Sequence, residues 1–503
     1  MRKGALAVVA VSLFLNGSGA ARAQSALPAL TLRQTLERAV AGNVDLRRQN
    51  VALRAAAANT LAAEGQFDVL LGGTAGLQHN VVPPLRMNDP TAGSTTIPTI
   101  DLNVSRTLET GGKLTVDAQA RRLSSTSYFT CTGAAPMGTV PAVLCDIYQP
   151  NLSLTFTQPL LRGFGREVTE QTLHKARISQ DLALLNRQAH AANDVRDTII
   201  AYWELAYQAQ DLEIRRSAEA LAREQLSMTE AQIKVGRMGQ LAAAAVNRAI
   251  AQAQGEVATS EQQLMGRALD LQRLFGAPVP RGFAGLRAAD VPEAAAHEVN
   301  VDAETEHALT ASPALKSLRQ GLALTEIDLR VALASMRPQL DFTGTVGSVG
   351  RNLAFGESLR QLVNSDDLVW SAGLTFSFPV QNRAAKGARD VAQAADESAH
   401  IDAQDLDLAI RDSVARFAAL IRSAGARIEF ARASVIYAQQ NLTAERARFD
   451  VGQSTNNDVL MRQQELKQAQ INVARAVVDL LEADVQLDAL TGDVLDTYGV
   501  VLR

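Results

Sequence analysis

Apolar and polar side chains alternate strictly in several short segments of this chain. In residues 151–157, Leu and Phe side chains fall on one side and Asn, Ser and Thr side chains on the other. A period of two predicts strands that have one apolar and one polar face. The pattern predicts main strands at these positions: 69–78, 151–157, 339–346 and 371–378. A further hairpin is predicted over 100–108 and 113–123, joined by two glycines, and whether it joins the main sheet stays open.

Between these strands, apolar positions repeat with helical spacing over very long stretches. Residues 167–234 contain no break in the helical pattern, and Val459, Leu466, Val473 and Leu480 follow one another at intervals of seven. Heptads that are rich in small residues are typical of antiparallel coiled-coil packing. A helix of about 68 residues would be roughly 100 Å long at about 1.5 Å per residue, which is more than a globular core needs.

The same order of elements occurs twice. A shift of 216 positions aligns residues 226–276 with 442–492 without a gap, and the Val-Gly pair at 235–236 then falls on the pair at 451–452. Each copy starts with a predicted helix, 32–65 in the first copy and 302–337 in the second. The chain is therefore predicted to be two copies of a helix–strand–strand–helix–helix plan.

The N-terminal residues 1–23 are predicted to be a secretory signal peptide. Arg2 and Lys3 precede an apolar run, and Ala21-Arg22-Ala23 supplies small residues at the cleavage positions. Loss of this segment, with its three basic residues, would change the formal net charge from −4 to −7. The other predicted segments are a first repeat at 24–276 (strands about 69–158, long helices about 167–275), a linker at 277–300, a second repeat at 301–492 (strands about 339–378, long helices about 384–490) and a C-terminal tail at 493–503.

Composition narrows the function classes. Aromatic residues make up only 4% of the chain while hydrophobic residues make up 47%, which favours close helix packing. The chain has no basic excess and no run of Lys and Arg, so nucleic acid is not expected as a partner. After the signal segment no window of 18 apolar residues occurs, so no transmembrane helix is predicted and a membrane role would have to use strands.

The two cysteines, Cys131 and Cys145, lie in a stretch rich in Gly, Pro, Ser and Thr. An exported chain meets an oxidising compartment, where a disulfide between them is the favoured prediction and two free thiols the alternative. A ring of this size would stabilise the local loop by about 3 kcal/mol in the chain-entropy model. The pair is interpreted as structural.

Motifs of catalysis are missing from the sequence. There is no H-E-x-x-H, G-x-S-x-G or phosphate-loop signature, and the six histidines show no metal-ligand spacing. Gly163-Phe164-Gly165 lacks the third glycine of a dinucleotide fingerprint and is predicted to be a strand-to-helix bend. We therefore expect no enzyme, and no catalytic, cofactor-binding or metal-binding residue.

Asp458 lies in the turn of the second helical hairpin, a few residues after Gly452. In a single chain it would be a helix cap or a solvated turn residue. If the hairpin tips of a symmetric oligomer meet on an axis, one Asp from each chain would instead form a ring of negative charge at a constriction. Both interpretations stay open from the residues alone.

The whole pattern resembles the TolC-like outer membrane efflux protein family. The resemblance is carried by the signal peptide, the duplicated plan, the junction Gln158-Pro159-Leu160-Leu161-Arg162-Gly163-Phe164-Gly165, the second junction at Phe378-Pro379, the two Val-Gly turns, and the Leu-x-Gly ends of both repeats. It implies an α+β membrane protein that forms a trimer, in which four strands from each chain build one 12-stranded β-barrel in the outer membrane. A long α-helical barrel would continue it through the periplasm.

The resemblance also implies a function and partners. Such a protein is the passive exit duct of a tripartite efflux or type I secretion system, with a homotrimer, a periplasmic adaptor, an inner-membrane pump and outer membrane lipid as partners and no cofactor. The positions that match the family's adaptor-docking turns are Val235, Gly236, Val451 and Gly452. Asp458 matches an acidic position of the closed entrance, and Met461 stands where some members have a second Asp.

Two other classes of protein are alternatives: a periplasmic adaptor and a coiled-coil stalk protein. A periplasmic adaptor also has long helical hairpins, but it would need β-rich flanking domains of the lipoyl type. A coiled-coil stalk protein would need a separate head domain. The cargo of an exit duct cannot be predicted from these residues.

Overall fold

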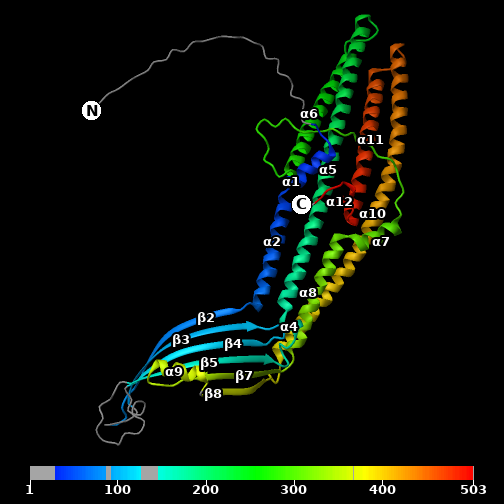
Figure 1. Cartoon of the computed structure of the whole chain (residues 1–503). Helices are drawn as coiled ribbons and strands as arrows, with labels where there is room; N and C mark the ends of the chain where they lie inside the picture. Colours follow the sequence, from blue (N-terminus) through cyan, green and yellow to red (C-terminus); the bar gives the residue numbers. More distant parts are fainter. Residues whose placement is uncertain (1–28, 87–91, 126–144, 366, 502–503) are drawn as a thin grey trace, which may run out of the picture. The chain divides into compact units, whose positions relative to one another are not determined.

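The computed structural model describes residues 29–86, 92–125, 145–365 and 367–501 of the 503-residue chain (Figure 1). The described residues divide into two compact units. Unit one comprises 29–42, 197–296 and 424–482, and unit two comprises 43–196, 297–423 and 483–501.

Unit two contains one antiparallel sheet of six strands in the order β2-β3-β4-β5-β7-β8 (Figure 1). The strands are β2 (Leu70–Val82), β3 (Gly93–Thr107), β4 (Lys113–Ser125), β5 (Cys145–Pro159), β7 (Gln339–Val349) and β8 (Leu368–Ser377). Helix α9 (Phe355–Asn364) lies between β7 and β8 in the chain, and its Phe355 ring meets the Tyr148 ring of β5 edge to face. The sheet therefore joins strands from both halves of the chain.

The prediction of four strands per chain was wrong, because the sheet has six. The hairpin whose place was open at 100–108 and 113–123 supplies β3 and β4, and these strands separate β2 from β5. The observed strands also extend beyond the alternating segments. Backbone pairing with a neighbour continues through Ser, Thr and Gly residues that contribute nothing to an apolar pattern.

The helices that start the two copies are each broken once. The predicted helix 32–65 is α1 (Leu32–Gly42) and α2 (Val44–Glu64), because the Asn43 side chain accepts hydrogen bonds from the amides of Asp45 and Leu46 and starts a new helix. The predicted helix 302–337 is α7 (Val301–Ala311) and α8 (Pro313–Ser335), with the break at a proline that occupies the first turn of α8.

The predicted long helices are present. After the short α4 (Arg166–Thr169) come α5 (Gln171–Lys234), α6 (Ala242–Leu274), α10 (Arg383–Asp450) and α11 (Asn456–Thr491). Helices α5 and α10 contain 64 and 68 residues. No helix in the described parts of the chain is both long enough and apolar enough to cross a membrane.

In unit one, the tips of the two helical hairpins share an apolar core. Leu442, Phe449, Val459 and Leu466 are buried in it, and Leu221 and Met228 of α5 pack against them. Also in unit one, β1 (Ala29–Leu30) pairs in parallel with β6 (Arg287–Ala288), so the segment before α1 and the segment predicted as a linker form a small sheet. The Tyr202 hydroxyl fixes this sheet to α5 through hydrogen bonds to Leu30 and Asp290 of 3.0 and 2.7 Å.

Candidate functional site

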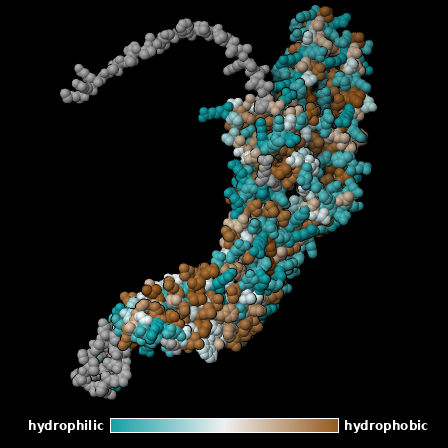
Figure 2. All heavy atoms as spheres, viewed as in Figure 1, coloured by the Kyte–Doolittle hydropathy of each residue, from teal (hydrophilic) through white to brown (hydrophobic). Residues whose placement is uncertain are grey.

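The six-stranded sheet has one apolar face that runs unbroken across all strands. Register pairs link one residue of every strand into a single row: Leu71, Val104, Val116, Leu154, Val346 and Trp370. Side chains of this row are exposed, up to 77% for Leu71 and 73% for Trp370. Figure 2 shows hydrophobic side chains gathered over these strands. An exposed apolar area of this extent is typical of a surface made for lipid or another protein.

The opposite face of the sheet is polar. A second row of register partners contains Leu70, Ser105, Thr115, Thr155, Thr345 and Ser371, so it is hydroxylic after its first member. Hydrogen bonds cross the strands on this face, including Gln119 Nε2 to Asp101 Oδ1 at 2.6 Å and Arg121 Nε to Gln149 Oε1 at 2.7 Å. An apolar face and a hydrogen-bonded polar face on one sheet fit a wall between lipid and water.

At one end, the sheet is joined to the helices by a tight junction. Strand β5 ends at Pro159, and Gly163 and Gly165 adopt φ of 85° and 100° before α4 begins. Such positive φ angles suit glycine and rarely other residues. The strand-to-helix bend predicted for Gly163-Phe164-Gly165 is thereby confirmed.

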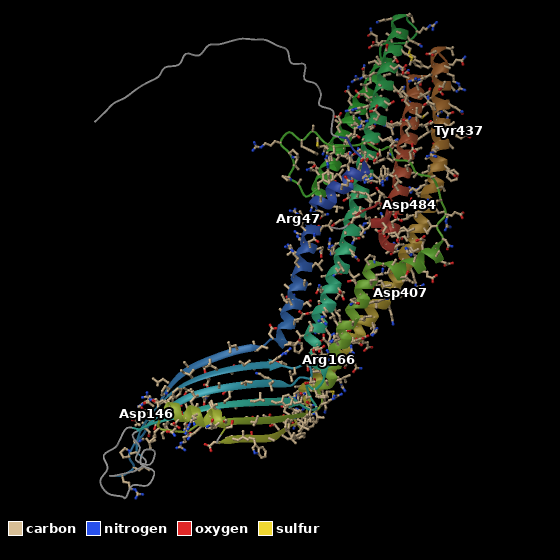
Figure 3. All side chains as sticks on the ribbon, in the orientation of Figure 1. Arg47, Asp146, Arg166, Asp407, Tyr437 and Asp484 are labelled. Carbon is tan, nitrogen blue, oxygen red and sulfur yellow. The ribbon has the colours of Figure 1, made fainter. Side chains whose placement is uncertain are left out.

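The β3–β4 turn is bonded into this junction. The Gly165 amide donates to the Thr110 carbonyl at 3.2 Å, and Gln158 Nε2 donates to the same carbonyl at 3.0 Å. Arg166, labelled in Figure 3, forms an ion pair of 3.0 Å with Glu109. The turn and the start of the helical region thus form one hydrogen-bonded structure.

The two hairpin tips end their first helices in the same way. At the first tip the Gly236 amide donates to Ile233 (3.0 Å) and the Arg237 amide to Gln232 (2.9 Å). Gly452 and Gln453 make the equivalent bonds to Phe449 and Arg448 at 3.0 and 2.8 Å. This is a Schellman motif, with its glycines at φ of 74° and 82°.

The valines before these glycines project into solvent. Val235 is 70% exposed and Val451 68% exposed, although both are large apolar residues. The four residues predicted for adaptor docking therefore form two exposed apolar turns of equal geometry. Docking itself stays a prediction.

Asp458 is the acidic partner of a capping box at the start of α11. Its carboxylate accepts from the Thr455 amide at 3.1 Å and from the Thr455 hydroxyl at 2.7 Å, and its own amide donates to that hydroxyl. The hydrogen bond from the Thr455 side chain is the main cause that lowers the pKa of Asp458. Within one chain the residue is a helix cap. Met461, a turn later, is half-exposed.

The structure adds a residue that the sequence analysis missed, Asn456. Its side chain is only 7% exposed, and its Oδ1 atom lies 2.9 Å from Gln225 Nε2 and 2.8 Å from Thr229 Oγ1 of α5. Its Nδ2 atom donates to the Ala242 carbonyl at the start of α6. A single side chain thus ties the second tip to the first. The sequence signal that could have found it was the polar pair Gln225 and Thr229, which lie four residues apart on α5 and are both buried.

A series of partly buried ion pairs lies along the helices of unit one. Lys467 lies 2.5 Å from Glu256, which also pairs with Arg215 at 3.2 Å. Farther along, Arg475 pairs with Glu204, Asp479 and Glu482, and burial raises the pKa of Glu482 to about 7. These pairs connect neighbouring helices and act as structural contacts.

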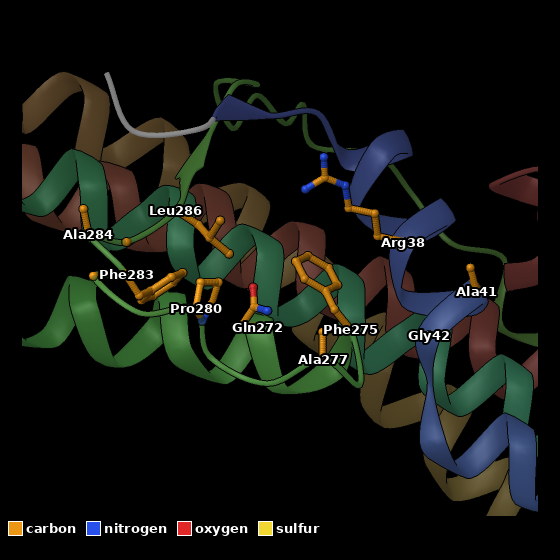
Figure 4. A pocket seen from close by; sticks show the side chains of 12 residues that line it. Arg38, Ala41, Gly42, Gln272, Phe275, Ala277, Pro280, Phe283, Ala284 and Leu286 are labelled. Carbon is orange, nitrogen blue, oxygen red and sulfur yellow. The ribbon is translucent and has the colours of Figure 1, made fainter. Parts of the chain in front are cut away.

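A mostly apolar cavity of about 700 Å³ lies in unit one, beside the small sheet (Figure 4). Arg38 of α1, Phe275 at the end of α6, and Phe283 and Leu286 of the linker line it. It holds none of the residues predicted as functional. Among the residues that the structure describes, no group of three or more His, Cys, Asp or Glu side chains could hold a metal ion.

The predicted disulfide lies outside the described residues. Cys131 falls in 126–144, which is not among the described residues, and only the backbone of Cys145 is described. The disulfide therefore stays a prediction.

Comparison with known proteins gives a family-model match over part of the chain and a shared fold over most of it. Residues 305–493 match the family model described as outer membrane efflux protein. No curated protein sequence matched the chain.

Solved structures of outer membrane proteins resemble the chain over most of its length. VceC from Vibrio cholerae has 16% identity and a TM-score of 0.66, covering 92% of this chain and 96% of its own. The CmeC channel of Campylobacter jejuni has 13% identity and a TM-score of 0.64, covering 92% and 85%. The MtrE channel of Neisseria gonorrhoeae has 14% identity and a TM-score of 0.61, covering 92% and 89%. At these identities the likeness concerns the fold.

Proposed function

We propose that the chain is a passive exit duct of the outer membrane, because residues 305–493 match the outer membrane efflux protein family model and the chain has the fold of TolC-like outer membrane channels. In this proposal three copies form the duct, a periplasmic adaptor opens it and an inner-membrane pump supplies the energy. It serves tripartite efflux or type I secretion and catalyses no reaction.

One observation carries the proposal: the six-stranded sheet has an exposed apolar face backed by a polar one. Rows of Leu, Val, Phe and Trp face one way on every strand, while Asp101, Gln119 and Arg121 hydrogen-bond on the other face. In lipid the apolar face is covered and the polar face lines water. A periplasmic adaptor or a coiled-coil stalk would not need a sheet with an exposed apolar face.

The hairpin tips are the proposed periplasmic entrance. The exposed turns at Val235-Gly236 and Val451-Gly452 are the proposed contacts for the adaptor. Asp458 and Met461 are the proposed pore constriction. The capping box is compatible with this role, because it uses one carboxylate oxygen, Oδ2, and leaves the charge at the exposed start of α11.

A matched pair of substitutions on β8 tests membrane insertion. Leu374 lies on the apolar face and the adjacent Thr375 on the polar face, and both are exposed. Arginine at the middle of a lipid-facing strand costs about 2–4 kcal/mol, whereas a lumen position tolerates it. We expect Leu374→Arg to abolish detergent-extractable trimer in outer membranes and Thr375→Arg to retain it.

The same experiment can refute the proposal. If both variants accumulate equally as trimers in the membrane, the apolar face does not contact lipid. If the wild-type protein is recovered as a water-soluble monomer after signal cleavage, the chain is not an outer membrane duct.

A further inference from the structure

We propose that each chain contributes six strands to the duct, so that three copies close a barrel of 18 strands rather than 12. In this arrangement β8 of one copy pairs with β2 of the next. The inference rests on the proposed outer membrane function and concerns the width of the same pore. The occupant of the free sheet edges is a second copy of this chain.

The β3–β4 hairpin is an integral part of the sheet. Strand β2 pairs with β3 along its whole length, from Leu70 with Ser105 to Val82 with Gly93. Strand β4 pairs with β5 from Lys113 with Thr157 to Ser125 with Cys145. A barrel of four strands per chain would require β2 to leave β3 and pair directly with β5.

The faces of the hairpin match those of its neighbours. Val104 and Val116 continue the apolar row between Leu71 and Leu154. Asp101 and Gln119 continue the polar face and hydrogen-bond to each other. A hairpin outside the barrel wall would leave its apolar face without lipid and its polar face without the lumen, so both faces place it within the wall.

The turn of the hairpin is also fitted to the helical junction. Gly111 has φ of 87°, and a Cβ atom at this residue would lie 2.4 Å from the Gly163 carbonyl oxygen. Only glycine allows so close an approach in this conformation. Together with the bonds of Thr110 to Gln158 and Gly165, this contact fixes the hairpin at the end of the wall where the helices begin.

The two end strands of the sheet suit pairing between copies. Six antiparallel strands alternate in direction, so β2 and β8 run in opposite directions and a rotated copy presents β2 antiparallel to β8. The apolar face reaches both edges, with Leu71 at one and Trp370 at the other. Open edges cannot remain within lipid, so the sheet must close on other copies.

Strand number determines the pore width. With strands about 4.8 Å apart and tilted by about 40°, a barrel of 18 strands has a backbone diameter of roughly 36 Å, against roughly 24 Å for 12 strands. After side chains are allowed for, the wider barrel leaves an aqueous channel of the kind found in large porins. The outer opening of this duct therefore admits bulkier cargo than a 12-stranded wall would.

Single cysteines can test the place of the hairpin. In a Cys131→Ser/Cys145→Ser background, Leu102→Cys on β3 and Val116→Cys on β4 report on the apolar face, and their neighbours Asn103→Cys and Asp117→Cys report on the polar face. Leu154→Cys and Ser153→Cys are the matched pair on β5. The trimer in vesicles of phosphatidylcholine and phosphatidylglycerol is treated with a membrane-impermeant maleimide, and its copy number is measured by native mass spectrometry.

We expect three copies, and at least tenfold faster labelling of the polar-face cysteine in all three pairs. If the two β5 cysteines differ in labelling rate but the two cysteines of the β3 pair and of the β4 pair are labelled equally fast, the hairpin lies outside the wall. The inference then fails while the proposed function stands. Two copies instead of three would also overturn the count of 18. If the β5 pair itself labels equally on both faces, the proposed function fails, and this inference fails with it.

Discussion

Replacing Asn456 should loosen the joint between the two hairpin tips. The Asn456→Ala variant removes the acceptor that lies 2.9 Å from Gln225 Nε2 and 2.8 Å from Thr229 Oγ1, and the donor to Ala242. Gln225 and Thr229 are fully buried, so water cannot replace the lost partner without opening the tips. The variant keeps the helix and its apolar packing otherwise intact.

The size of the effect follows from the buried donors that lose their acceptor. A buried donor left without its acceptor costs about 1–3 kcal/mol. The Thr229 hydroxyl can donate to the backbone carbonyl of Gln225, 2.8 Å away, instead. Most of the loss of free energy therefore comes from the side-chain amide of Gln225, which has no other partner among the described residues. We therefore expect about 2–3 kcal/mol for local opening, which corresponds to about 30- to 150-fold faster amide exchange, since about 1.4 kcal/mol is tenfold.

Hydrogen exchange of the detergent-extracted protein measures this opening at the first turns of α6 and α11. Asn457→Ala is the matched control, because Asn457 is the exposed neighbour in the same turn. Adding Gln225→Leu to Asn456→Ala should recover part of the protection, since it removes the stranded amide. Equal exchange in the Asn456→Ala and Asn457→Ala variants, or no recovery with Gln225→Leu, would refute the reasoning.

Three further predictions concern the tips and the C-terminal region. Asp458→Asn keeps an oxygen acceptor for Thr455 but removes the charge, so it should weaken channel block by divalent cations in single-channel recordings; unchanged block would argue against an acidic constriction. Gly236→Val and Gly452→Val place a β-branched residue at φ of 74° and 82°, so each should reduce adaptor cross-linking while the trimer persists; normal cross-linking would remove the turns from the docking site. Burial and nearby carboxylates raise the pKa of Asp488 to about 6, above its unfolded value of about 3.9, so this residue makes unit two less stable as pH rises from about 4 to about 6. Asp488→Asn should therefore flatten the pH dependence of stability, measured by amide hydrogen exchange at pH about 4.5 and about 7. A pH dependence like that of the wild type would contradict this prediction.

The sequence was sufficient for most of the fold because its signals are long and repeated. Heptads sustained over α11 and an unbroken helical pattern over α5 predicted the long helices, and strict alternation predicted β5, β7 and β8. The breaks at Asn43 and Pro313 were missed, since the helical pattern continues on both sides of each break. Their capping and proline signals, however, were present in the sequence.

The strand count was not predicted, because it depends on pairing between distant segments. Alternation identified the hairpin but could not tell whether β2 pairs with β3 or with β5. The close contact of Gly111 with Gly163 joins residues 52 positions apart in sequence, and only the folded chain reveals it. The same holds for Asn456, whose partners Gln225 and Thr229 lie in the other repeat.

The two hairpin tips share their stop signal but differ in their start signal. Gly236 and Gly452 end α5 and α10 alike, whereas Thr455 and Asp458 cap α11 and no side chain caps α6 at Leu241. The two copies of the tip thus differ in local stability, because the start of α11 is capped by side chains and the start of α6 is not. We expect α6 to unwind from its first turn before α11 does whenever the tips part, so the first repeat would lead any movement at this end of the hairpins.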